Sequence, residues 1–148
     1  MTGSGLAVFL SVVAGLAGAV QVSMMSQLGD RISIVGAVAF ATLFTAVVSF
    51  GLLLAFRKSF AAYRNAFDHP WWMLMGGLLG LLIIFTITYA GGRLGVAATV
   101  GILIAGQLLM GAAIDRWGLF GSAKIPLHWP RMLGIVLLGA GAALSLKK

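Results

Sequence analysis

The sequence GVAATVGILIAGQLLMGAAID, residues 95–115, decides the fold of this chain. It is apolar over about the 20 residues that a helix needs to cross the hydrocarbon core of a bilayer. At helical spacing, Thr99 and Gln107 lie on one stripe of such a helix. The nearly opposite stripe consists of small residues: Ala97, Gly101 and Ala105. Small residues allow a neighbouring helix to approach closely, whereas polar groups in hydrocarbon need a partner or a water-filled cavity. The stretch is therefore predicted to be a membrane helix with a packing face and a polar face.

The composition of the whole chain is typical of a membrane protein. Of its 148 residues, 61% are hydrophobic and 9% are charged, whereas about 25% of the residues in a soluble domain are charged. We expect an all-α, polytopic helical bundle in the lipid bilayer, because helices satisfy their own backbone hydrogen bonds there. The net charge of +7 comes from basic residues at the ends of apolar segments, so no nucleic-acid partner is expected. Cysteine is absent, which excludes disulfides and cysteine-ligated metals.

Five transmembrane helices are predicted from the apolar segments. They cover residues 5–28, 33–56, 71–90, 95–114 and 131–146. Short turns at 29–31 and 91–93 are expected to end the first and third helices. The connection at 116–130 is amphipathic and is expected to lie among the lipid headgroups. The first helix lacks a preceding basic segment, so we interpret it as a retained span rather than a cleaved signal peptide. No connection has room for a soluble domain, and residues 1–148 are predicted to form a single membrane domain.

The basic residues indicate only a slight preference for one orientation. Six lie on the side of the N-terminus, namely Arg57, Lys58, Arg64, Arg116, Lys124 and Arg131, and four lie on the other side, namely Arg31, Arg93, Lys147 and Lys148. Because cytoplasmic loops carry the excess of basic residues, the N-terminus is predicted to be cytoplasmic. So small a bias also fits a chain that inserts in both orientations. Two antiparallel copies would then form the inverted repeat that transporters usually carry within one chain. Single and dual orientation are both retained as alternatives.

Polar side chains within the predicted spans are the candidates for a substrate pathway. Gln21 and Gln107 are predicted to hydrogen-bond a small-molecule substrate near the middle of the membrane, although such amides also join helices at about 0.6 kcal/mol each. Thr42 and Thr45 share a helix face with Ser49, and Thr99 lies on the polar stripe described above. Mid-span hydroxyls more often bond to carbonyls of their own helix, which is the competing interpretation for these residues.

Glycines and one acidic residue complete the candidate set. Close helix packing is predicted at four glycines: Gly76, Gly80, Gly101 and Gly106. Asp115, next to Arg116, is interpreted as half of an interfacial ion pair that locks a helix end. No charged residue lies near the centre of a span, which disfavours proton-coupled export of cations and favours a neutral or zwitterionic cargo. The sequence contains no catalytic constellation and no metal-ligand spacing, so neither an enzyme, a metal site nor a cofactor is expected.

Four short motifs mark the fourth predicted helix and the connection after it: AATV at 97–100, GQL at 106–108, ID at 114–115 and GLFG at 118–121. Together they resemble the YdcZ-like family of the drug/metabolite transporter superfamily. The resemblance covers essentially the whole chain. It implies a five-helix half of a ten-helix transporter, which pairs with a second copy or a homologue in the inverted orientation. It also implies transport of a small organic solute across a bacterial inner membrane.

The function predicted from the sequence is therefore that of a transporter protomer with its pathway at an antiparallel dimer interface. Two other functions stay open at this stage. One is a dual-topology channel for an anion or a small solute. The other is a non-transporting accessory subunit of a heteromeric membrane complex. The residues do not distinguish a homodimer from a heterodimer and do not specify the solute.

Overall fold

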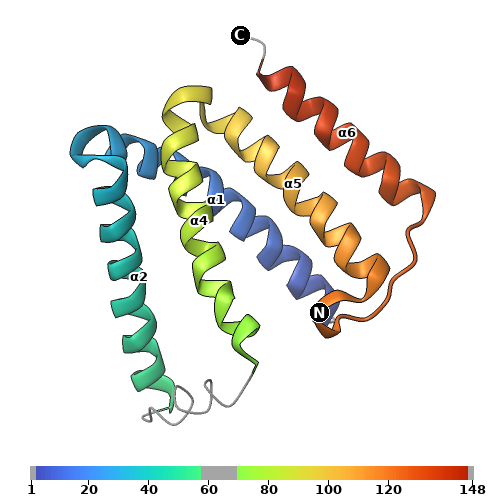
Figure 1. Cartoon of the computed structure of the whole chain (residues 1–148), viewed down its shortest axis with the longest axis horizontal. Coiled ribbons are helices and arrows are strands. Elements are labelled where there is room, and N and C mark those ends of the chain that lie inside the picture. Colours follow the sequence, from blue (N-terminus) through green and yellow to red (C-terminus); the bar gives the residue numbers. More distant parts are fainter. Residues whose placement is uncertain (1–2, 58–69, 147–148) are drawn as a thin grey trace. The chain divides into compact units, whose positions relative to one another are not determined.

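The computed structural model describes residues 3–57 and 70–146, and within these ranges it is helical without strands (Figure 1). The α-helices are α1 (Gly3–Ile32), α2 (Ile34–Arg57), α4 (Trp71–Leu94), α5 (Val96–Trp117) and α6 (Trp129–Ser145), with the short 3-10 helix η1 (Leu119–Gly121) between the last two. The predicted all-α membrane fold is confirmed. Residues 58–69, which include the basic residues Lys58 and Arg64, and the C-terminal Lys147 and Lys148 lie outside the described residues.

Length and hydropathy agree with membrane spans. Within the described residues, α1, α2, α4 and α5 are long and apolar enough to cross a bilayer. The fifth apolar helix, α6, has 17 residues and lies at the short end of the range for a span. Pro130 occupies one of its first positions, where the missing N–H of proline costs no helical hydrogen bond.

The predicted turn at 29–31 is wrong. Helix α1 continues through it to Ile32, and the chain reverses at Ser33, which has a φ of 89°. The Ser33 hydroxyl then accepts a hydrogen bond from the Gly36 N–H at 3.2 Å, as an N-cap serine does. Ser33 is therefore the single residue between α1 and α2, and it caps the start of α2. Gly29 lies within α1.

The predicted turn at 91–93 is wrong for the same reason. Helix α4 continues to Leu94, and the chain turns at Gly95, which has a φ of 85° that a side chain would disfavour. The glycines before it serve as contact positions instead. A Cβ at Gly92 would lie 3.5 Å from a carboxylate oxygen of Asp30, and Gly91 is buried.

The chain divides into two compact units, which are described separately. Residues 1–22 and 93–148 form one unit, and residues 23–92 form the other. The prediction of a single membrane domain stays a prediction.

In the first unit, α5 and α6 are antiparallel neighbours (Figure 1). At one end of the pair, Gly101 lies against Ala142, because a Cβ at position 101 would lie 3.3 Å from the Ala142 Cβ. At the other end, an Arg131 guanidinium N–H donates to a carboxylate oxygen of Asp115 at 2.5 Å. Gly118 ends α5 in the left-handed conformation with a φ of 65°, where glycine is the favoured residue.

In the second unit, the C-terminal ends of α1 and α4 meet closely. Gly29 lies against the methyl group of Thr88, which is buried together with Met25, Ser26 and Ile87. Helix α2 runs beside α4, with open grooves between their side chains.

Candidate functional site

A row of hydroxyl groups on α2 faces a groove between α2 and α4. Thr42, Thr45 and Ser49 follow one another at helical spacing, and all three line the groove, whose volume is about 670 Å3. The other lining residues are apolar or glycine: Ala46, Phe50, Leu53, Gly77, Gly80, Leu81 and Ile84. A volume of about 300–1,000 Å3 suits a small organic molecule.

Two glycines keep the α4 side of this groove open. A Cβ built at Gly77 or Gly80 would meet nothing within 4 Å. The space in front of these glycines is therefore part of the groove rather than a helix–helix contact. A Cβ at Gly76, which the sequence analysis also predicts as a packing position, would likewise meet nothing within 4 Å, and Gly76 does not line the groove.

The three hydroxyls differ in their hydrogen bonding. Thr42 donates to carbonyl oxygens of its own helix, with Oγ1 at 2.9 Å from the Val38 oxygen and 3.0 Å from the Ala39 oxygen. Thr45 and Ser49 have exposed side chains that form no hydrogen bond within residues 3–57 and 70–146. In hydrocarbon such groups need a partner, so these two hydroxyls are available to a ligand or to water.

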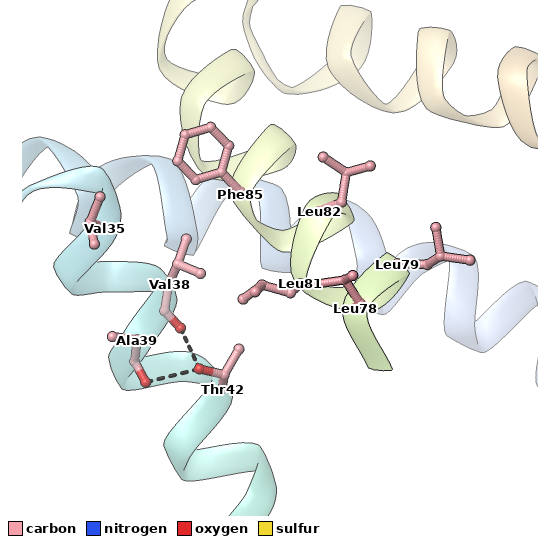
Figure 2. A pocket seen from close by; sticks show the side chains of 9 residues that line it. All are labelled: Val35, Val38, Ala39, Thr42, Leu78, Leu79, Leu81, Leu82 and Phe85. Carbon is pink, nitrogen blue, oxygen red and sulfur yellow. Dashed lines mark hydrogen bonds between the residues drawn. The ribbon is translucent and has the colours of Figure 1, made fainter. Parts of the chain in front are cut away.

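A second, apolar groove adjoins the first. It measures about 660 Å3 and shares Thr42 and Leu81 with the hydroxyl-lined groove. Figure 2 shows its nine lining side chains, with Leu81 reaching from α4 toward α2 and Thr42 bonded back to its own helix. Apart from Thr42 the lining is aliphatic or aromatic: Val35, Val38, Ala39, Leu78, Leu79, Leu81, Leu82 and Phe85. Together the two grooves combine an apolar wall with one row of hydroxyls.

The other predicted pathway residues belong to the unit of residues 1–22 and 93–148. Gln21 and Gln107 are exposed, and neither forms a hydrogen bond within the described parts of the chain. Thr99 is buried, and its hydroxyl donates to the Gly95 oxygen at 2.8 Å. The Thr99 hydroxyl is therefore satisfied within its own helix, whereas the two amides have no hydrogen-bond partner among the described residues.

The remaining predicted residues also have defined surroundings. Gly101 contacts α6 as described above, whereas nothing lies within 4 Å of a Cβ at Gly106. Asp115 makes its ion pair with Arg131, not with the adjacent Arg116, whose side chain is exposed. The helix-end lock thus joins α5 to α6 rather than two neighbouring residues.

The comparisons with known proteins identify the family. The family model described as "Putative inner membrane exporter, YdcZ" matches residues 6–144. This chain belongs to the YdcZ family. It is 27% identical over 140 residues to the inner membrane protein YdcZ of Escherichia coli (strain K12), a match that covers 93% of this chain and 92% of that protein. No solved structure matches the chain.

In this YdcZ-family chain, the charge of the groove lining limits what the grooves can bind. All described residues that line the two α2–α4 grooves are uncharged. Among the described residues, no group of three histidine or acidic side chains lies together in a way that could hold a metal ion. The grooves can therefore bind through hydroxyl hydrogen bonds and apolar contact.

Sequence reasoning missed one lining residue of the groove and one ion-pair partner. Gly77 lines the groove, although the sequence analysis singles out Gly76 and Gly80 on this helix and not Gly77. The signal for it is helical spacing, because Gly77, Gly80 and Ile84 share one face of α4. Arg131 carries no local signal as the partner of Asp115, since 16 residues separate them.

Proposed function

We propose that this chain is the protomer of a transporter that moves a small organic solute across a bacterial inner membrane. One observation carries the proposal. Thr45 and Ser49 line an open groove at the level of a membrane span, and their hydroxyls lack partners within the described residues. The family description as an exporter supports the same function, and the E. coli relative supports the inner membrane as its location.

The proposed cargo is neutral or zwitterionic. A cargo with a net charge would need an opposite charge in the groove, because an isolated ion in a low-dielectric site is costly. The described lining residues provide hydroxyls and apolar surface only. The cargo is therefore expected to carry groups that hydrogen-bond to hydroxyls, next to apolar surface that fits the Leu81 side of the groove.

The proposed working unit is an antiparallel dimer, with the pathway at its interface. The exposed amides of Gln21 and Gln107 have no hydrogen-bond partner within the described chain. A second, inverted copy or a paired homologue supplies partners for them and closes the open side of the groove. Gln107 lies near the middle of α5, so it approaches the same depth in an inverted partner.

The test uses the absence of cysteine in the natural chain. Thr45→Cys and Ser49→Cys are introduced singly, and reconstituted protein is treated with a membrane-impermeant thiol reagent. The cysteine thiolate attacks the reagent, and the thiolate forms in water and not in hydrocarbon. We expect labelling at both positions to be at least about tenfold faster than at Val47→Cys, since Val47 is exposed on α2 and lines neither groove. Equal, slow labelling at all three positions would mean that the groove holds lipid rather than a pathway.

A second measurement addresses the amides. Candidate neutral solutes are screened for flux in vesicles, and Gln21→Ala and Gln107→Ala are compared with the natural chain for the solute that is transported. We expect each variant to lower flux, and unchanged flux in both would contradict their assignment to the pathway. Stimulation by solute on the opposite side indicates a carrier, whereas fast flux without it indicates the channel alternative.

A further inference from the structure

A separate groove lies between α5 and α6, within the unit of residues 1–22 and 93–148. Its volume is about 330 Å3, and its walls are almost entirely apolar. The lining residues are Leu109, Ala112, Ala113, Arg116, Trp117, Leu127, Met132, Ile135 and Val136. From Leu109 to Arg116 the groove follows α5 for about 10 Å, at a rise of about 1.5 Å per residue. It is therefore an apolar slot with a single charged residue at one end.

The charge of Arg116 is not neutralised within the described chain. The neighbouring carboxylate of Asp115 is bound to Arg131 at 2.5 Å. Arg116 itself is exposed and forms no ion pair among the described residues. A second cation lies close by in the fold, because the aliphatic stem of Lys124 lies against Gly118, two residues after Arg116.

Arg116 lies in the last turn of a helix long enough to cross a bilayer, where lipid headgroups are expected. Trp117 lines the same end of the groove and is exposed, as tryptophans are where a helix meets the headgroup region. An arginine at that depth binds phosphate oxygens through its planar fork of N–H donors. The apolar walls then continue from the charge toward the hydrocarbon, as a phospholipid continues from its phosphate into its acyl chains.

We propose that the α5–α6 groove binds one anionic phospholipid, with its phosphate at Arg116 and one acyl chain along the walls from Ala113 to Leu109. Binding requires both the phosphate and the acyl chain of the lipid. The phosphate accounts for the guanidinium that has no ion-pair partner among the described residues, and the acyl chain accounts for the apolar slot. The proposal does not depend on what the chain transports.

The proposal is tested by native mass spectrometry of the full chain in detergent. Affinities are measured for phosphatidylglycerol and phosphatidylcholine with identical acyl chains, and inorganic phosphate is added as a competitor. Four variants are compared: R116Q, R116K, A113L and R31Q. R31Q is the matched control, because Arg31 is an exposed basic residue in the last turn of α1 and does not line the groove.

We expect R116Q to weaken phosphatidylglycerol binding about fivefold. R116K keeps the charge but loses the planar fork of N–H donors, so it is expected to weaken binding less than R116Q does. R31Q is expected to stay within about twofold of the natural chain. A113L, which fills the slot, is expected to weaken binding of both lipids. Because Arg116 is exposed, R116Q tests the proposal even if A113L does not fold.

Three results would overturn the proposal. Equal losses with R116Q and R31Q would mean that lipid responds to overall charge and not to this groove. Unchanged lipid binding in folded A113L would show that no acyl chain occupies the slot. Displacement of phosphatidylglycerol by inorganic phosphate at similar concentration would mean that the site recognises phosphate without a lipid.

Discussion

Gly29 of α1 faces the methyl group of Thr88 of α4 so closely that a Cβ at residue 29 would lie 2.7 Å from Thr88 Cγ2. The methyl group cannot easily rotate away. Thr88 is buried, and its hydroxyl donates to the Ile84 oxygen at 2.7 Å, which holds the side-chain rotamer. The absence of a side chain at Gly29 is therefore what lets the ends of α1 and α4 meet.

The first prediction follows from this contact. Gly29→Ala is expected to lower the free energy of unfolding by about 1–3 kcal/mol, because the added methyl group overpacks a stiff, buried neighbour. Thr88→Ser removes the conflicting Cγ2 and keeps the hydroxyl, so the double variant G29A/T88S is expected to recover most of the loss. Unfolding by denaturing detergent, followed by circular dichroism, measures these differences.

A control for this prediction lies in the same helix. A Cβ at Gly15 meets nothing within 4 Å, so Gly15→Ala is expected to be neutral or slightly stabilising. If G29A and G15A have the same effect, or if T88S does not compensate for G29A, the proposed contact does not govern stability.

The second prediction concerns the partner of Asp115. A double-mutant cycle with Asp115→Asn and Arg131→Gln is expected to give a coupling energy of about 1 kcal/mol, since the ion pair is only partly buried. The cycle with Asp115→Asn and Arg116→Gln is expected to give a coupling energy near zero. The unfolding free energies of the natural chain and of the five variants supply both values. If the coupling energy between Asp115 and Arg116 is the larger of the two, Asp115 pairs with its neighbour in the sequence and not with Arg131.

The third prediction uses two glycines of the same helix to test the hydroxyl-lined groove. Gly80→Leu places a side chain in the groove beside Thr45, whereas Gly76→Leu lies outside it. In the Thr45→Cys background, G80L is expected to slow labelling by the impermeant thiol reagent about tenfold. G76L is expected to leave the rate within about twofold. Equal slowing by both variants would indicate an effect on the helix as a whole and not on the groove.

The fourth prediction concerns close packing of α5. Gly101→Leu is expected to destabilise the chain by about 1–3 kcal/mol, because it forces α6 away at Ala142.

Gly106→Leu, with no neighbour within 4 Å, is expected to leave the free energy of unfolding of the monomer nearly unchanged. If Gly106 lies at the proposed dimer interface, G106L shifts the protein toward monomer in size-exclusion chromatography. A monomer–dimer equilibrium unaffected by G106L would place the interface elsewhere.

The sequence predicts the helices of this fold well, for a physical reason. Apolar length alone determines which segments can cross a bilayer, and all five apolar segments are helical. The junctions could not be predicted in the same way. Glycine permits both a turn and a close contact, and at Gly29 and Gly92 the neighbouring helix decides between them. That neighbour is distant in the sequence.

The sequence also predicts one side of the candidate site, the face of α2 that carries the hydroxyls. The spacing of Thr42, Thr45 and Ser49 places them on one face, and the structure sets that face along a groove. Two features depend on which helices are adjacent: the α4 side of the groove, where Gly77 lies, and the ion-pair partner of Asp115. Hydrophobic patterning contains little information on that point, because every span of a membrane bundle is apolar on most sides.

The most direct test of the account is the orientation of the chain in the membrane. A reporter that shows on which side of the membrane it lies is fused after Lys148. The chain is expressed near its native level without a related partner. The account predicts reporter activity on both sides, because two copies in opposite orientations form one transporter. Activity on one side only would contradict the antiparallel homodimer and would mean that this chain needs a differently oriented partner or is not half of a transporter.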